Sequence, residues 1–354
     1  MVHGGAGVGL IEKNSIYTGS TKVMVNRDIN FSLWLDFIER DYLKNEFSEL
    51  IEKGIINGAT SNPAIFANAI TTSPAYKEQL ASLEGKSPKE KYEALAIQDI
   101  KTAAQMLRPL YDEGNDGYIS IEVDPFLCND TEGTIKEGKR LFKAIGEPNV
   151  MVKVPATQAG YEAMSALMAD GISVNATLVF SPKQATQCFK AMTKGIAKGE
   201  NYGACRVEGV ISVFVSRFDR ALDAELEQAG IDPSKTGIYN AAKIYNMIED
   251  NKVPNIRALF ASTGVKGDNL VPNYYVKELM APHSVNTAPL STIEAHIKTN
   301  DNAEALPIEN SVINGYFMNL EDNDFKMDKI YKQLLDEGLV AFEESFTDML
   351  NQIA

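Results

Sequence analysis

The chain has 354 residues, a formal net charge of −14 and an apolar fraction of 44%. The length allows two or three domains or one large barrel, and the apolar fraction is typical of a folded globular protein. The acidic charge argues against nucleic acid or an anionic membrane surface as a partner, although a small phosphate could still bind at a local cationic spot. No run of about 18 apolar residues is present, so the sequence predicts no membrane span.

Cysteine and histidine are too few and too scattered to predict a metal or redox site. The three cysteines, Cys128, Cys188 and Cys205, are widely spaced and odd in number. With no secretory signal present, this pattern indicates a reduced, cytoplasmic setting. Beyond the first few residues only His283 and His296 remain, so we predict neither a multi-histidine metal site nor a Ser/His/Asp triad.

The first residues, MVHGGAGVGLIEKNSIYTGS, match neither a secretory signal nor a catalytic motif. They lack a basic region followed by an apolar one. GGAGVG resembles a phosphate-binding loop, but no strand precedes it and no βαβ unit follows it. We therefore expect residues 1–24 to be a leader or an expression tag without ordered structure, and residues 25–354 to form one domain.

Between about Ser32 and Thr299, short apolar segments alternate with longer amphipathic ones. The short segments predict strands over Ser32–Phe37, Gly58–Asn62, Tyr118–Val123, Val150–Pro155, Ser173–Phe180, Val210–Val215, Ala258–Ser262 and His283–Asn286. The longer segments predict helices over Tyr42–Lys53, Ser87–Leu107, Thr131–Ala144, Ala159–Ala169, Pro182–Lys198, Phe218–Gln228 and Tyr239–Asp250. Eight strand–helix units with right-handed crossovers close naturally into a parallel barrel.

Two segments add to the simple repeat. The second unit carries extra helical sequence over Ser73–Leu107, and a last helix is predicted over Asp328–Gln352. No internal repeat, low-complexity block or long linker divides the chain. The predicted fold class is therefore α/β, a single (β/α)8 TIM barrel with extra helices after the second strand and at the C-terminus.

Polar residues recur within the predicted strands or at their C-terminal ends. All strands of a parallel barrel point to the same end, so these side chains should converge on the mouth where barrel enzymes carry their chemistry. A purely structural barrel would fill most inward positions with Val, Ile or Leu. The residues are Asp36, Thr60, Asn62, Glu122, Lys153, Asn175, Thr177, Ser212 and Arg217.

Lys153 stands between two valines in VMVKVPAT (150–157), so strand alternation turns it toward the barrel axis. We expect burial to disfavour the charged form of such an amine, and the neutral amine is the form that attacks a carbonyl. Glu122 in SIEVD is predicted to face inward in the same way. A buried ion pair between Lys153 and Glu122 is the alternative, purely structural interpretation.

The other polar residues also have a structural alternative. Asp36 follows an apolar segment and could move protons near the lysine, or it could cap the next helix. Asn175 and Thr177 share one strand face and could satisfy each other. Arg217 follows a strand and opens a helix, a favourable place for a phosphate with Ser212 as an extra donor, but an exposed arginine there is often only solvated.

Five ordered segments of the chain together resemble the transaldolase family, in its longer bacterial form. The resemblance runs from about Ser32 to about Pro289 and implies a (β/α)8 barrel. It also implies transfer of a dihydroxyacetone unit between sugar phosphates in the pentose phosphate pathway, with no metal or organic cofactor. Separately from the resemblance, we expect a monomer or a homodimer as the working form. The segments are ATSNPAIFANAI (59–70), SIEVDPFL (120–127), VMVKVPAT (150–157), GISVNATLVFS (171–181) and SVFVSRFD (212–219).

The resemblance also implies a role for each polar residue. Lys153 matches the Schiff-base lysine, Asp36 the proton-transferring aspartate and Glu122 the glutamate that activates water, with Thr177 positioning that water. The substrate-binding positions are matched by Asn62, Asn175 and Ser212 for dihydroxyacetone, Thr60 in support, and Arg217 for phosphate. Ser61 departs from the threonine of many relatives, and residues 309–325 match no family role.

Two other functions remain open on the sequence alone. A simple Schiff-base aldolase on the same barrel would release free dihydroxyacetone, and acceptor dependence would separate it from a transferase. A catalytically inactive barrel could serve as a binding or structural protein. The presence of Lys153, Asp36 and Glu122 argues against the inactive barrel.

Overall fold

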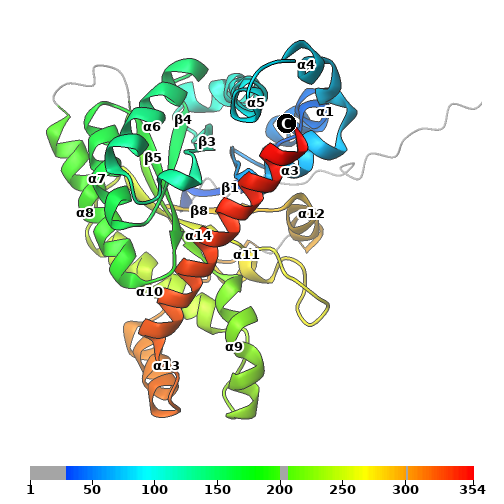
Figure 1. Ribbon diagram of the computed structural model, residues 1–354. Helices are drawn as coiled ribbons and strands as arrows, with labels where there is room; N and C mark the ends of the chain where they lie inside the picture. The colour runs from blue at the N-terminus through cyan, green and yellow to red at the C-terminus, as the bar shows by residue number, and fades with distance from the viewer. Residues whose placement is uncertain (1–28, 200–205, 300–301) are drawn as a thin grey trace, which may run out of the picture.

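Eight parallel strands form a closed barrel in the computed structural model, which describes residues 29–199, 206–299 and 302–354 (Figure 1). Each strand pairs in parallel with the next in sequence, and the eighth pairs with the first. The (β/α)8 prediction is therefore confirmed. The predicted leader, residues 1–24, lies outside the described residues.

The strands are short and completely buried, and their bounds lie within two residues of the predicted ones. They are β1 (Phe31–Leu35), β2 (Gly58–Thr60), β3 (Tyr118–Glu122), β4 (Val150–Pro155), β5 (Ser173–Val179), β6 (Gly209–Phe214), β7 (Ile256–Ala261) and β8 (Ser284–Ala288). Their register is regular except in β5, where a bulge follows Ala176. Leu178 within this bulge has a φ of 55°, a left-handed conformation that is uncommon outside glycine.

Helices surround the barrel and fill its connections (Figure 1). They are α1 (Arg40–Lys44), α2 (Glu46–Glu52), α3 (Pro63–Thr72), α4 (Lys77–Ser82), α5 (Pro88–Asp112), α6 (Thr131–Ile145), α7 (Gln158–Ala169), α8 (Pro182–Lys198), α9 (Ser216–Gln228), α10 (Thr236–Asp250), α11 (Tyr274–Glu278), α12 (Leu290–Thr299), α13 (Asn310–Asp322) and α14 (Met327–Gln352). The described residues also contain the 3-10 turns η2 (Pro74–Tyr76) and η3 (Pro125–Leu127). The helix predicted over Tyr42–Lys53 is divided at Asn45, whose φ of −117° and ψ of −80° are not helical.

Side-chain caps set the starts of the long helices. Ser87 before α5 and Ser181 before α8 each form a capping box with the residue three positions on, and a proline follows each serine. These contacts satisfy backbone N–H groups that have no partner within the helix. The extra helical sequence predicted over Ser73–Leu107 therefore includes most of one long helix, α5, which has 25 residues.

Apolar residues cover the outer faces of the strands, where the surrounding helices pack. A buried polar group lies away from the mouth, level with the first residues of β2 and β3. Asp116 accepts from Trp34 Nε1 at 2.9 Å and pairs with Arg257 Nη2 at 2.7 Å.

The last helix, α14, crosses the mouth of the barrel (red in Figure 1). It packs against α3, α5, η3 and β5. Its prediction over Asp328–Gln352 agrees with the observed bounds, whereas its position over the mouth was not predicted. None of the helices in the described ranges has the length and apolar character needed to span a membrane.

Candidate active site

The strand ends at the mouth form one polar row. In the register of the sheet, Glu122 on β3 is the partner of Lys153 on β4, and Lys153 is the partner of Asn175 on β5. Partners on neighbouring parallel strands point to the same side, so the three side chains lie next to one another inside the barrel. The inward orientation predicted for Lys153 and Glu122 is confirmed.

A cavity of about 210 Å³ opens at this mouth. Seven of the nine predicted residues line it, namely Asp36, Thr60, Asn62, Lys153, Asn175, Ser212 and Arg217. Glu122 and Thr177 are buried beside the cavity, with 5% and 0% of their surface exposed. The predicted residues therefore converge on one site that is large enough for a small molecule.

Lys153 lies at the inner wall of this cavity with 6% of its surface exposed. Its Nζ donates to the backbone carbonyl of Ser61 at 3.3 Å and lies 3.4 Å from Oε2 of Glu122. The ion pair that was the structural alternative thus exists. Its length is beyond that of a normal charge-assisted hydrogen bond, so it holds the amine loosely.

Glu122 is a buried acid whose pKa is shifted toward neutrality. Burial raises its pKa from 4.5 to about 7, and the nearby Lys153 charge offsets only part of that effect. Neither carboxylate oxygen has a hydrogen-bond partner among the described residues, and the same is true of the Thr177 hydroxyl. Unsatisfied buried polar groups are costly, so their presence here marks a place where a water or substrate atom can bind.

Asp36 follows β1 and faces the same cavity. Its Oδ1 accepts from Thr60 Oγ1 at 2.7 Å, and Thr60 in turn contacts Thr287 Oγ1 at 2.6 Å. Burial raises the pKa of Asp36, while Lys153 and the bond from Thr60 oppose the shift. The alternative role as a helix cap is wrong, because Glu39 caps α1 by accepting from the N–H of Tyr42.

Asn175 is held by its neighbours on both sides. Its Nδ2 donates to Ser120 Oγ at 3.0 Å, and its Oδ1 accepts from Ser212 Oγ at 2.6 Å. The alternative in which Asn175 and Thr177 satisfy each other is therefore wrong. Asn62 is likewise fixed, because its Oδ1 accepts from the N–H of Ile65 and caps α3.

Arg217, the second residue of α9, is half-buried at the edge of the cavity. Its guanidinium lies 5.4 Å from the centre of the Phe214 ring. Across the described ranges, no carboxylate comes within 4.0 Å of it. An arginine with its donors available at a cavity edge and a helix N-terminus can bind a phosphate.

Comparison with known proteins supports one family. The family model described as "Transaldolase/Fructose-6-phosphate aldolase" matches residues 33–353. The chain is 48% identical over 337 residues to a transaldolase of Campylobacter jejuni subsp. doylei, covering 92% of this chain and 99% of the relative. It is 45% identical over 322 residues to a transaldolase of Helicobacter pylori strain Shi470, covering 91% and 98%. The chain belongs to the transaldolase/fructose-6-phosphate aldolase family.

The match to the transaldolase/fructose-6-phosphate aldolase family extends well past the five motifs. It runs to residue 353 and thus includes α14, which contributes Ala341, Phe342 and Ser345 to the cavity wall. Sequence reasoning missed these residues, because only the tertiary fold brings the last helix to the mouth. It also missed Phe214 and Thr287, although both follow the inward alternation of their strands.

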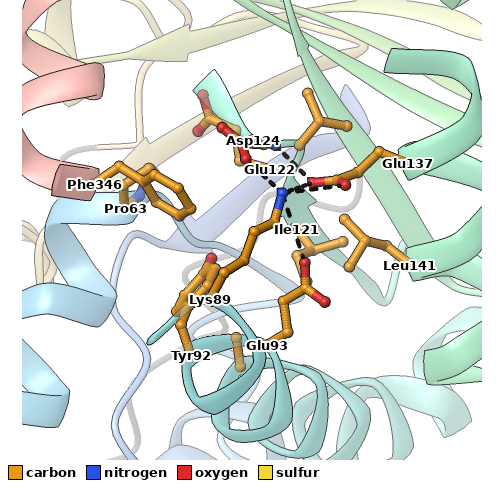
Figure 2. A pocket seen from close by; sticks show the side chains of 12 residues that line it. Pro63, Lys89, Tyr92, Glu93, Ile121, Glu122, Asp124, Glu137, Leu141 and Phe346 are labelled. Carbon is orange, nitrogen blue, oxygen red and sulfur yellow. Dashed lines mark hydrogen bonds and ion pairs between the residues drawn. The ribbon is translucent and has the colours of Figure 1, made fainter. Parts of the chain in front are cut away.

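A second, much smaller cavity of about 10 Å³ lies beside Glu122 and has room for about one water molecule (Figure 2). Lys89 of α5 enters it and pairs with Asp124 and Glu137, with Glu93 at 4.0 Å. The Lys89 amine is thereby already neutralised by carboxylates. It does not take part in the ion pair of Glu122 with Lys153.

No group of three or more His, Cys, Asp or Glu side chains suited to a metal ion occurs in the part of the chain that the structure describes. Cys128 and Cys188 are buried free thiols, and Cys205 lies outside the described residues.

Proposed function

We propose that this chain is a transaldolase that works through a Schiff base on Lys153. It moves a dihydroxyacetone unit from sedoheptulose 7-phosphate or fructose 6-phosphate to glyceraldehyde 3-phosphate or erythrose 4-phosphate. The observation that carries the proposal is the Lys153 amine, buried in a cavity and approached by carboxylates from β1 and β3. The curated relatives, named transaldolase, support the same activity.

Capture of the ketose requires the amine and a proton relay. The Lys153 amine adds to the ketose carbonyl, and loss of water gives an iminium that acts as an electron sink. Glu122, 3.4 Å from the amine and with a pKa of about 7, can both give and take a proton near neutrality. The unpartnered Thr177 hydroxyl is suited to hold the water that passes between them.

Cleavage requires a base on the other side of the substrate. Asp36 removes the proton of the C4 hydroxyl, the C3–C4 bond breaks, and its electrons enter the iminium to give an enamine. The raised pKa of Asp36 suits a general base, and the bond from Thr60 orients the carboxylate. The departing product is the shortened aldose phosphate.

Two groups of residues hold the substrate ends. Asn62, Asn175 and Ser212 are assigned to the hydroxyls of the dihydroxyacetone unit, and their existing hydrogen bonds preorganise them. Arg217 is assigned to the phosphate at the cavity edge. The reaction as proposed needs neither a metal nor an organic cofactor.

The setting of the enzyme completes the proposal. Its substrates are sugar phosphates of the non-oxidative pentose phosphate pathway. We place the enzyme in the cytoplasm. We propose a monomer or a homodimer as the working form, which size-exclusion chromatography with light scattering distinguishes.

The test of this activity is acceptor dependence. Fructose 6-phosphate with erythrose 4-phosphate should give sedoheptulose 7-phosphate and glyceraldehyde 3-phosphate over many turnovers. Without an acceptor, turnover should nearly stop after one equivalent of glyceraldehyde 3-phosphate per site. Continuous release of dihydroxyacetone at the same rate with and without acceptor would instead identify the second activity in the family description, fructose-6-phosphate aldolase.

A further inference from the structure

The middle of α14 lies directly over the Lys153 amine. The centre of the Phe342 ring is 5.8 Å from Nζ of Lys153, and Phe342 is 8% exposed. Phe342, with Ala341 and Ser345, forms the side of the cavity opposite the strands. The other lining residues come from the strand ends, from α3 and from α9, and α14 crosses this end of the barrel (Figure 1).

This helix is fastened at both ends. The Tyr331 hydroxyl donates to Oδ1 of Asn240 at 3.0 Å near its start, and Lys91 donates to the carbonyl of Ile353 at 2.9 Å just after its last residue. Such attachment keeps the Phe342 ring in place over the amine.

The centre of the helix rests on the bulge of β5. A Cβ atom on Gly338 would lie 2.9 Å from Cδ2 of Leu178, so any larger side chain at this point would require the Leu178 side chain to shift. Leu178 reaches this position in a left-handed backbone conformation, which carries an energetic cost outside glycine. Leu178, Phe180, Phe214 and Phe342 belong to one apolar cluster between the strand ends and α14.

A transferase has to protect its covalent intermediate from water, and α14 is placed to do so. After cleavage, the enamine on Lys153 must wait for the second aldose phosphate. If the enamine carbon takes a proton and water adds to the resulting iminium, the C–N bond breaks. The net reaction is enamine plus water to free dihydroxyacetone plus the Lys153 amine. Keeping water from that carbon therefore decides between transfer and hydrolysis.

We propose that Phe342 of α14 is a specificity-determining residue that shields the enamine on Lys153 from water and so favours transfer over hydrolysis. The inference rests on the proposed Schiff-base function of Lys153. It assigns to α14 a part in the outcome of the reaction that the polar strand residues of the cavity do not supply, because an apolar ring excludes water and a polar side chain does not.

The test is the ratio of free dihydroxyacetone to transfer product in the Phe342→Ala variant. Both products are measured in one reaction with fructose 6-phosphate and saturating erythrose 4-phosphate. We expect the ratio to rise by about tenfold or more, which corresponds to about 1.4 kcal/mol of lost discrimination. Phe342→Leu, which keeps apolar bulk over the amine, should give a ratio between those of the wild type and the alanine variant.

Met349→Ala is the matched control, because Met349 is a fully buried residue of the same helix that does not line the cavity. It should lower the melting temperature and leave the ratio unchanged. An unchanged ratio in folded Phe342→Ala would overturn the inference, and so would an equal rise in Met349→Ala. If Phe342→Ala does not fold, Phe342→Leu decides in the same way, a raised ratio supporting the inference and a wild-type ratio overturning it.

Borohydride trapping of the wild type separates this inference from the proposed function. If no adduct forms on Lys153, the proposed function fails. If the adduct forms in both wild type and Phe342→Ala while the ratio stays constant, only the role of Phe342 fails.

Discussion

Two carboxylates, Glu122 and Asp36, face the Lys153 amine from different strands and in different surroundings. Glu122 has no hydrogen-bond partner within the described residues, whereas Asp36 accepts from Thr60. Burial raises the pKa of both, and the Lys153 charge opposes the shift in both. The difference in hydrogen bonding supports two different roles. Glu122 exchanges protons with water, and Asp36, held by Thr60, acts as a fixed base.

Asp36→Asn should separate capture of the ketose from cleavage. The amide keeps the size of the side chain but cannot take the C4 hydroxyl proton, and a general base contributes about 10²–10⁴-fold. Turnover should fall by about that factor, while an adduct still forms on Lys153. Mass spectrometry after borohydride reduction should find the whole ketose phosphate on the protein. A variant that carries mostly the three-carbon fragment would show that another group performs the cleavage.

Glu122 should make the folded protein less stable as the pH rises from about 5 to about 7. Its folded pKa of about 7 lies above the ordinary value of 4.5, so in this range the folded state keeps a proton that the unfolded state has released. The contribution of Glu122 to the free energy of unfolding is therefore least favourable above pH 7. Below about pH 4.5 Glu122 is protonated in both the folded and the unfolded state, so its contribution no longer changes with pH.

The comparison of Glu122→Gln with the wild type isolates this effect. The free energy of unfolding of the variant minus that of the wild type should increase by roughly 1–3 kcal/mol between about pH 5 and about pH 8. Urea denaturation at several pH values measures it. A difference that stays constant or decreases over this range would contradict the raised pKa.

Among the helices and strands, the contact between α14 and the β5 bulge is the feature that local sequence could not reveal. The strands are predictable to within two residues, because alternation and β-branched composition are local signals. The helix α14 is predictable as a helix, but its place over the mouth depends on contacts with Leu178 and Phe180, far away in sequence. The same limit explains why the sequence suggests Asp36, and not Glu39, as the cap of the first helix.

Two helical glycines provide a matched test of that contact. A Cβ atom added to Gly315 in α13 would meet nothing within 4 Å, whereas one added to Gly338 in α14 would meet Leu178 at 2.9 Å. Gly315→Ala should stabilise the protein by about 0.5–1 kcal/mol through helix propensity. Gly338→Ala gains the same propensity but overpacks the contact, so it should lose about 1 kcal/mol net. Equal stabilisation by both substitutions in thermal melts would show that α14 does not rest closely on β5.

The barrel as a whole has its polar chemistry at one end and a structural polar group at the other. In the register of the sheet Trp34 is level with the first residues of β2 and β3, Arg257 is the second residue of β7, and Asp116 and Arg257 are almost completely buried. This pairing was not predicted, because Asp116 precedes its strand and Arg257 lies in β7, with no motif connecting them. The convergence of the mouth residues was predictable because all strands of a parallel barrel end there.

Asp116→Ala should therefore affect stability and spare the chemistry. It leaves Arg257 as a buried charge without its carboxylate partner, which typically costs about 3–5 kcal/mol. We expect a loss of this size in urea denaturation, with kcat and KM of the folded protein within about twofold of the wild type at low temperature, since neither Asp116 nor Arg257 lines the cavity. A large change in kcat with little loss of stability would show that the two ends of the barrel are coupled.

The whole mechanism depends on Lys153 carrying the substrate as a Schiff base, and mass spectrometry after borohydride reduction in the presence of fructose 6-phosphate detects that bond. We expect a reduced three-carbon adduct on the peptide that contains Lys153, greatly diminished when erythrose 4-phosphate is added before the borohydride. We expect no adduct in Lys153→Met, which replaces the amine with an apolar side chain of similar length and should remain folded. An adduct on another lysine, or normal turnover by Lys153→Met, would contradict the mechanism.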